Sequence, residues 1–182
     1  MCIRDRIHAR LVINAAGLYA DEIAHMLGGN LVTIYPVRGE YAELVPRKDL
    51  FINGLIYPLP EESGHGLGIH LTKTTWETII VGPTAKYQNS KIDYEQNRLP
   101  LELFYDWARR LVPNLRLDDL KLGNTGIRAT CRHPNEHFSD FIIDRDSSIP
   151  TLIHVAGIDS PGLTACLAIG KMVSRLVDET LN

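Results

Sequence analysis

The stretch from His154 to Val173 joins an apolar strand to a helix through a polar turn flanked by glycines. The turn contains Gly157 and then Asp159-Ser160-Pro161-Gly162. Serine commonly caps helices, proline suits the first helical position, and glycine lets a ligand approach the backbone closely. Because the first N–H groups of a helix have no internal partner, such an end can bind a phosphate, a carboxylate or a ring oxygen that gains negative charge.

The helix that follows this turn begins with an apolar half, from Leu163 to Gly170, and ends with a charged half. An apolar surface on all sides predicts that the positive end of the helix lies inside the protein. Two interpretations remain open. The turn is either a site for an anionic group or a well-capped start of a core helix.

Two further side chains have chemistry suited to a site. Arg128, in TGIRAT, lies among apolar neighbours on a predicted strand, and its planar guanidinium suits a carboxylate. The alternative is a structural arginine paired with an acid of the sheet. His70, in GLGIHLT, lies on a strand whose neighbours Ile69 and Leu71 face the other way. A neutral imidazole there can accept a hydroxyl proton; the alternative is a satisfied interior histidine.

Composition narrows the class of protein. The 182 residues include 45% hydrophobic and 23% charged residues, which is typical of a globular protein. A net charge of -3 gives no reason to expect nucleic acid or an anionic membrane surface. The three cysteines have no pairing or metal spacing, which favours a reducing compartment. We therefore expect a cytoplasmic protein without a transmembrane segment, and leave membrane-peripheral association open.

His133 and His137, in HPNEH, have a spacing that occurs in zinc sites. Pro134 and Asn135 argue against a helix there, so the two rings need not share a face. We favour a solvated loop and predict no metal site.

The first six residues, MCIRDR, match nothing around them. We interpret residues 1–6 as an artefact derived from a sequencing adapter, and exclude them from the fold. The alternative is a native start.

The predicted elements fall into three groups. Residues 10–14 form a short strand, residues 18–27 a helix stopped by Gly28-Gly29, and residues 31–35 another strand that is closed by Pro36. In the middle, short strands at 37–45, 55–59, 67–72 and 78–83 predict an antiparallel sheet, followed by an amphipathic helix over 99–115. TGIRATC, DFIID and TLIHVAG then supply three more strands before the final helix.

This order predicts an α/β fold with an added antiparallel β region, arranged as two lobes. Residues 7–35 and 140–182 would build one discontinuous α/β domain, and residues 36–139 would build a β-rich second domain.

Eight segments carry a resemblance to a known family: VINAAGLYAD, PVRGEYAEL, LIYPLP, GLGIHLT, VGPTA, GIRA, DFIID and HVAGIDSPGLTACLAIG. Together they span Val12 to Gly170 and resemble the C-terminal part of FAD-dependent oxidoreductases of the D-amino-acid oxidase superfamily. Within it the chain is most similar to L-2-hydroxyglutarate dehydrogenases and oxidases. The resemblance implies a Rossmann-like FAD-binding domain for residues 7–35 and 140–182, and a substrate-binding domain for residues 36–139.

The resemblance also implies which residues bind FAD. The turn before the last helix would lie against the pyrimidine edge of the flavin, which gains negative charge on reduction. The residues expected to bind the cofactor are Ala15, Ala16, Gly17, Gly39, Gly157, Ser160, Pro161, Gly162 and Leu163. One feature departs from the family: no G-x-G-x-x-G turn is present. We therefore expect a C-terminal fragment without the site for the adenosine diphosphate of FAD.

The same resemblance suggests roles in the substrate site. Arg128 would bind a substrate carboxylate, and His70 would act as the catalytic base. Arg38 would hold substrate or flavin, or else pair with Glu40 or Glu43. Tyr57 is a further candidate for lining the substrate pocket.

The expected function is oxidation of a small 2-hydroxy acid, with L-2-hydroxyglutarate favoured, by hydride transfer to FAD. The fragment alone would be inactive. Electrons would pass on to oxygen, a quinone or a carrier protein. The alternatives are an FAD-dependent glycerol-3-phosphate dehydrogenase, an amine or amino-acid oxidase, or a non-catalytic subunit of the same fold.

Overall fold

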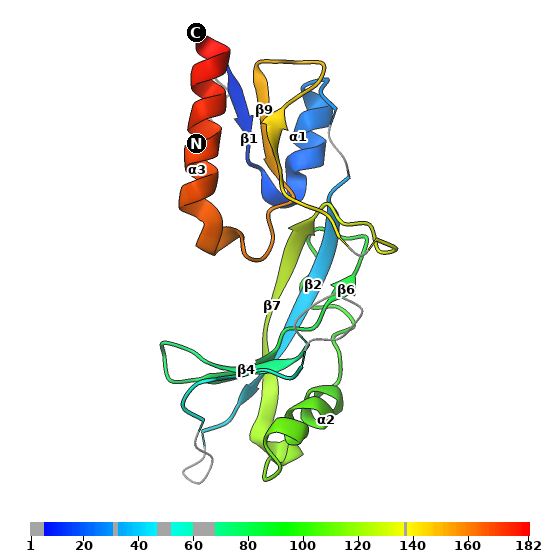
Figure 1. Cartoon of the computed structure of the whole chain (residues 1–182). Helices are drawn as coiled ribbons and strands as arrows, with labels where there is room; N and C mark the ends of the chain where they lie inside the picture. The colour runs from blue at the N-terminus through cyan, green and yellow to red at the C-terminus, as the bar shows by residue number, and fades with distance from the viewer. Residues whose placement is uncertain (1–5, 31–32, 47–51, 60–67, 137) are drawn as a thin grey trace. The chain divides into compact units, whose positions relative to one another are not determined.

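A computed structural model describes residues 6–30, 33–46, 52–59, 68–136 and 138–182 (Figure 1). These residues form two compact units. Unit 1 takes its described residues from 1–35, 129–133 and 139–182, and unit 2 from 36–128 and 134–138. Mixed α/β structure with an antiparallel sheet is the fold class that the sequence predicts.

Unit 1 is built on a three-stranded sheet in the order β1-β9-β8. Strand β1 (Val12–Asn14) pairs in parallel with β9 (Leu152–Ala156), and β8 (Ile142–Arg145) pairs with β9 in the antiparallel sense. Helices α1 (Ala20–Met26) and α3 (Gly162–Leu181) flank the sheet (Figure 1). A parallel pair needs a long crossover connection. Here that connection is the whole chain between β1 and β9.

The entry into α1 follows from the local sequence. A 3₁₀ turn over Gly17–Tyr19 precedes the helix. Asp21 and Glu22 lie in its first turn, where the helix dipole favours negative charge. The helix ends before Gly28, whose φ of +76° is the left-handed conformation common after a helix.

A buried polar network joins β1 and β9 to the turn after β8. His154 Nε2 lies 2.9 Å from Asp146 Oδ2, and His154 Nδ1 lies 3.4 Å from the amide nitrogen of Asn14. The Asn14 amide also donates to the Ala20 carbonyl at 2.7 Å. Since an NH₂ group only donates, Nδ1 of His154 is the acceptor and Nε2–H donates to Asp146. The network therefore fixes the tautomer of His154.

Unit 2 is built on a six-stranded sheet. The order β3-β4-β5-β2-β6 is hydrogen-bonded, and β7 pairs with β2. Its strands are β2 (Tyr35–Leu44), β3 (Leu55–Ile56), β4 (His70–Lys73), β5 (Ile79–Gly82), β6 (Lys86–Tyr87) and β7 (Leu120–Thr130). The strand pairs β2–β5, β2–β6, β3–β4 and β4–β5 are antiparallel.

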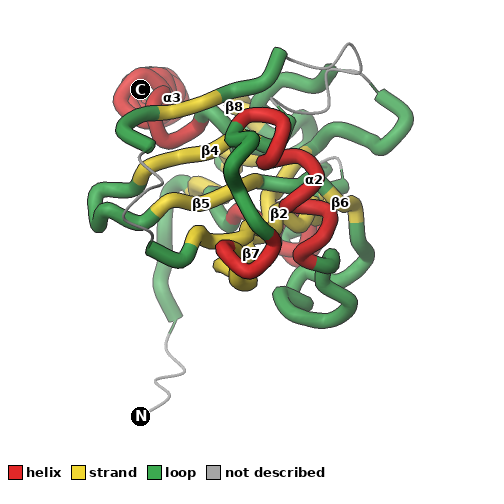
Figure 2. The backbone as a smooth tube through the Cα atoms, turned by 90° about the horizontal axis from the view of Figure 1, so that it is seen from below, coloured by secondary structure: helices red, strands yellow, loops and turns green. Residues whose placement is uncertain are grey.

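Helix α2 (Leu101–Leu111) covers the sheet of unit 2 (Figure 2). Phe104 and Ala108, one helical turn apart, are both fully buried and belong to one core cluster with Leu71 of β4 and Val81 of β5. The short 3₁₀ turn Leu117–Asp119 leads into β7. The amphipathic pattern of α2 therefore packs as its sequence predicts.

Several predicted boundaries are wrong. The helix predicted over 99–115 is shorter, Leu101–Leu111, and the strand predicted over 67–72 begins at His70. A strand was predicted over residues 31–35, but Thr33 and Ile34 are not in a strand, and residues 31–32 lie outside the described residues. The next strand instead begins at Tyr35 and continues through Pro36, which the sequence had suggested as a stop. The predicted strand over 55–59 is only two residues long, Leu55–Ile56. Proline is tolerated near the first residue of a strand, which accounts for the error at Pro36.

The Asp146 carboxylate predicts how stability depends on pH. Its pKa is lowered to about 2, first because His154 donates to it, and also because the N–H groups of Ser148, Asn30 and Ile149 do. A carboxyl whose folded pKa lies below its unfolded value of about 3.9 stabilises the fold above that pH. This contribution is lost as the pH falls from about 4 towards 2. Asp146→Asn should lower the free energy of unfolding at neutral pH and remove this part of the pH dependence.

The control is Asp144→Asn, an exposed carboxylate that accepts from the N–H of Arg145. Denaturant unfolding at a series of pH values measures both variants. An Asp146→Asn protein with the same pH slope as the parent would contradict the assignment.

Candidate functional site

The turn before α3 starts the helix one residue later than the sequence suggests. The helix begins at Gly162, and Pro161 is its N-cap with φ of -100° and ψ of 45°. No side chain caps the helix. The predictions of Ser160 as the N-cap and Pro161 as the first helical residue are therefore wrong. The Gly162 N–H donates to the Asp159 carbonyl oxygen at 2.7 Å, and this hydrogen bond closes the turn.

The expected burial of α3 is also wrong. Gly162 is its only buried residue, and the side chains of Leu163 and Leu167 are 90% and 87% exposed. The helix contacts β8 and β9 of unit 1, and these contacts leave its apolar first half uncovered. In the described part of the chain, the N–H groups of Leu163 and Thr164 have no hydrogen-bond partner. The helix end is thus an open pair of donors at the positive end of a 20-residue helix.

Gly157 and Gly162 are required by packing within unit 1. Gly157 has a φ of +67°, and a Cβ there would meet Cys131 Sγ. A Cβ at Gly162 would meet Ile158 Cγ2. Burial raises the pKa of the Cys131 thiol to about 11, and the carboxylates of Asp159 and Asp21 add to the rise. The thiol therefore stays protonated near neutral pH and acts as a packing group beside the turn.

Unlike the turn before α3, the loop after β1 has open space beside its backbone at Gly17. Gly17 has a φ of +57° and no heavy atom within 4 Å of the position that a Cβ would take. The Ala16 N–H is held by Asn14 Oδ1 at 3.4 Å, and the Tyr19 N–H by the Ala16 carbonyl at 3.1 Å. Of the predicted cofactor residues Ala15, Ala16 and Gly17, it is Gly17 that presents an open backbone surface.

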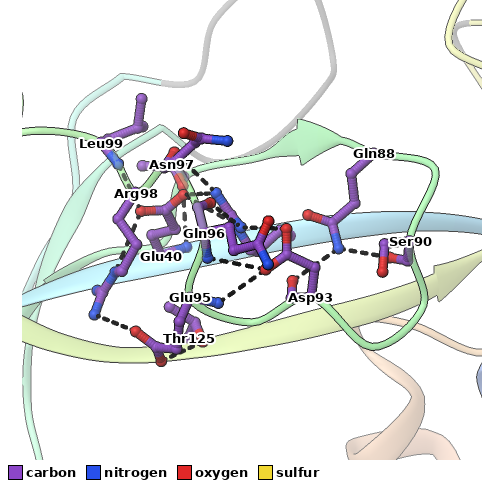
Figure 3. A network of polar contacts seen from close by, with 12 residues as sticks. Glu40, Gln88, Ser90, Asp93, Glu95, Gln96, Asn97, Arg98, Leu99 and Thr125 are labelled. Atoms are coloured by element: carbon purple, nitrogen blue, oxygen red, sulfur yellow. Dashed lines mark hydrogen bonds and ion pairs between the residues drawn. The ribbon is translucent and has the colours of Figure 1, made fainter.

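Arg38 lies in a buried network of ionic and polar contacts in unit 2. Figure 3 labels members of this network, among them Glu40, Gln96 and Asn97. Both Arg38 and Glu40 are almost completely buried, and they form an ion pair at 2.9 Å. Nε of Arg38 also donates to Glu40 Oε1 at 3.1 Å, Nη1 donates to the Gln96 carbonyl at 2.8 Å, and Nη2 donates to the Asn97 carbonyl at 3.1 Å. Asp93 lies 3.7 Å away. Every nitrogen of this guanidinium therefore has a partner within the unit, which favours the structural alternative for Arg38.

Glu40 is the centre of the same network. Its Oε2 accepts from the Leu99 N–H at 2.9 Å and lies 3.5 Å from Arg98 Nε. Gly39, between the two ion-pair residues, packs closely against Pro83 Cβ and the Thr84 carbonyl, each 3.3 Å from a Cβ placed there. Gly39 therefore has a packing reason of its own to be glycine. Sequence reasoning named Glu40 only as one of two acids that could pair with Arg38.

Arg128, in β7, has the opposite environment. It is partly buried, and within the described ranges the structure gives no hydrogen bond or ion pair to its guanidinium. Its charge acts on Tyr41, whose pKa is raised by burial while Arg128 opposes that rise. An arginine held near a tyrosine without a carboxylate partner is available to an external anion.

His70 and Tyr57, both in unit 2, are brought together. Their rings are stacked, with centroids 4.5 Å apart and planes 27° from parallel. His70 Nδ1 lies 3.0 Å from the Gly68 carbonyl oxygen. His70 is partly exposed, whereas its neighbour Leu71 is fully buried in the core. The alternation expected for this strand is therefore present.

The described histidines belong to no group of three or more possible metal ligands. The His133 ring makes an edge contact with Tyr35 at 5.4 Å, and His137 lies outside the described residues. Within the described ranges, no three His, Cys, Asp or Glu side chains are grouped so as to hold a metal ion. None of the described helices is long and apolar enough to cross a membrane.

Known proteins resemble this chain over most of its length. A curated relative is the mitochondrial L-2-hydroxyglutarate dehydrogenase of Arabidopsis thaliana, 35% identical, with 91% of this chain and 37% of the relative covered. Another is a glycerol 3-phosphate dehydrogenase of Caloramator mitchellensis, 32% identical, with 93% and 34% covered. The chain thus spans less than half the length of these relatives.

A solved structure agrees with these relatives. It is the dithionite-reduced L-alpha-glycerophosphate oxidase of Mycoplasma pneumoniae with FAD bound, which matches with a TM-score of 0.79 and 27% identity. The match covers 92% of this chain and 42% of that protein. The family model described as FAD dependent oxidoreductase matches residues 3–176. The chain belongs to this family of FAD-dependent oxidoreductases.

Proposed function

We propose that the chain is part of a longer flavoenzyme that oxidises a small 2-hydroxy acid, with L-2-hydroxyglutarate the favoured substrate. The observation that carries the proposal is the Arg128 guanidinium, which has no hydrogen-bond or ion-pair partner in the described part of unit 2. The similarity to L-2-hydroxyglutarate dehydrogenases supports the same substrate class. We use the name family-length protein for the longer protein, as long as these relatives, that contains this chain.

The residues of unit 1 fit one part of FAD. The open N–H groups of Leu163 and Thr164 suit a ring oxygen that carries partial negative charge. The open surface at Gly17 would accept a flat group close to the backbone. Bound FAD supplies the acceptor for a hydride. No residues here form the glycine-rich turn that binds the adenosine diphosphate, so we assign that function to the rest of the family-length protein.

The residues of unit 2 would bind and deprotonate the substrate. Arg128 would bind the carboxylate next to the hydroxyl carbon through two parallel N–H···O bonds. His70 would accept the hydroxyl proton, so that the O–H bond breaks, an N–H bond forms, and the C–H electron pair leaves with its hydrogen as hydride. The product is a 2-oxo acid. We do not assign Arg38 to the substrate, because its donors are already used.

A second candidate substrate is glycerol 3-phosphate. The Caloramator mitchellensis relative and the Mycoplasma pneumoniae oxidase both act on glycerol phosphates by name. A guanidinium binds phosphate as well as carboxylate, so Arg128 alone does not separate the two substrates.

We predict that the 182-residue chain alone binds FAD poorly, because the turn for the adenosine diphosphate is missing. Equilibrium titration of FAD, followed by gel filtration, measures this. The family-length protein is the positive control. A yellow 182-residue protein that keeps one FAD per chain through gel filtration would contradict the prediction.

We predict that Arg128→Lys in the family-length protein raises the KM for the 2-hydroxy acid. Lysine keeps the charge but loses the two-pronged geometry, a loss of about 1–3 kcal/mol on the scale of a charge-assisted hydrogen bond. Steady-state kinetics would then give a fall in kcat/KM of roughly 5- to 150-fold. Unchanged kinetics on every 2-hydroxy acid would assign Arg128 to structure.

Arg38→Lys is the matched comparison, since Arg38 also lies on a strand of unit 2. A lysine keeps the charge beside Glu40 but cannot make all the contacts of the guanidinium, and a hydrogen bond to a charged group contributes about 1.5–3 kcal/mol. We therefore expect Arg38→Lys to lower the free energy of unfolding by a few kcal/mol, whereas Arg128→Lys should leave it within about 0.5 kcal/mol of the parent. Denaturant unfolding of the 182-residue chain measures both, and equal destabilisation by the two variants would contradict this contrast.

A further inference from the structure

The hydrogen bond from His70 determines where its ring proton lies. Nδ1 is 3.0 Å from the carbonyl oxygen of Gly68. A carbonyl oxygen only accepts, so Nδ1 must carry the hydrogen. In the neutral ring the lone pair is then on Nε2. Within the described part of the chain, Nε2 has no hydrogen-bond partner.

Two features hold this arrangement. The Tyr57 ring stacks on the imidazole at 4.5 Å and limits its rotation. Gly68 has a φ of +73°, and a Cβ there would lie 3.0 Å from Pro58 Cγ. A residue with a side chain would therefore be strained at position 68, and its carbonyl would shift away from His70.

We propose that the Gly68 carbonyl and the Tyr57 ring are positioning groups that keep His70 in the Nδ1–H tautomer and so assign proton acceptance to Nε2. This inference rests on the proposed function, in which His70 removes the hydroxyl proton of the substrate. The transfer breaks the substrate O–H bond and forms Nε2–H. The protonated ring retains both contacts, because Nδ1–H still donates to Gly68 and the ring still faces Tyr57.

The stack is also compatible with the product of this step. A cation lies favourably over the face of a tyrosine ring, and the Tyr57 ring is stacked on the imidazole with centroids 4.5 Å apart. The same ring therefore orients the neutral base and accommodates the cation that forms. This gives Tyr57 a role through His70, beyond the general one of lining a substrate pocket.

His154 provides an opposite reference within the same chain. Its Nε2–H donates to Asp146 and its Nδ1 accepts from Asn14. An unrestrained neutral histidine in water carries its proton mostly on Nε2, so the Nδ1–H form of His70 is the diagnostic one. The two histidines should have opposite tautomers in one spectrum.

The test is long-range ¹H–¹⁵N NMR of the 182-residue chain with ¹⁵N-labelled histidine, at a pH where the rings are neutral. His70→Gln assigns the His70 signals. We expect a protonated Nδ1 and an unprotonated Nε2 for His70, and the reverse for His154. A protonated Nε2 on neutral His70 would overturn the proposal, and this parent measurement does not depend on any variant folding.

Variants then test each positioning group. Tyr57→Ala should move His70 towards a mixture with the Nε2–H form, whereas Tyr57→Phe keeps a ring and should retain Nδ1–H. Gly68→Ala should also admit the Nε2–H form. A ¹H–¹⁵N amide spectrum identifies folded variants. A folded Tyr57→Ala protein that stays wholly in the Nδ1–H form would overturn the role of Tyr57.

Kinetics of the family-length protein connect this tautomer to turnover. Tyr57→Ala should lower kcat about tenfold, part of the roughly 10²–10⁴-fold that a general base contributes. The two ideas fail separately. If the tautomers are as expected but no 2-hydroxy acid reduces the flavin, the proposed function fails while the positioning of His70 stands. If substrate is oxidised but His70 carries Nε2–H, the positioning fails alone.

Discussion

The buried ion pair between Arg38 and Glu40 is the interaction on which the arrangement of unit 2 depends. Two charges removed from water cost several kcal/mol each, and this cost is offset only when every remaining donor and acceptor is satisfied. Unit 2 satisfies them with the segment 93–99, which supplies two carbonyls, an N–H and the Arg98 side chain. The pair therefore attaches an irregular segment to the middle of β2. It also commits Arg38 to structure and leaves Arg128 available to an anion.

The two histidines show how environment decides chemistry. His154 is buried between an acceptor and a donor that use both of its nitrogens. His70 has one nitrogen bound to a carbonyl, one face against a tyrosine, and its second nitrogen open in the described part of the chain. The first arrangement joins strands of unit 1, and the second leaves a lone pair that can accept a proton. Sequence reasoning singled out His70 but missed the Asn14–His154–Asp146 network, because the partners are far apart in sequence and none belongs to a short motif.

Local pattern predicted the elements better than their environments. The 3.6-residue period of α2 and the glycines after α1 give the correct helices, because these features act within a few residues. The burial of α3 was mispredicted, since apolarity shows what a helix can bury and not whether a partner surface is present. Arg38 and Arg128 both stand beside or near a glycine on a strand. The ion pair with Glu40 and the contacts with segment 93–99 distinguish Arg38 from Arg128, and the contacts with segment 93–99 cannot be predicted from local pattern.

Anaerobic flavin reduction in the family-length protein decides between the candidate substrates. The oxidised flavin absorbance is followed after adding L-2-hydroxyglutarate, its D enantiomer, glycerol 3-phosphate or an amino acid, each in a separate reaction. We predict that L-2-hydroxyglutarate bleaches the flavin faster than the other compounds and yields one 2-oxo acid per flavin reduced. Bleaching by glycerol 3-phosphate or an amino acid, with none by any 2-hydroxy acid, would contradict this prediction.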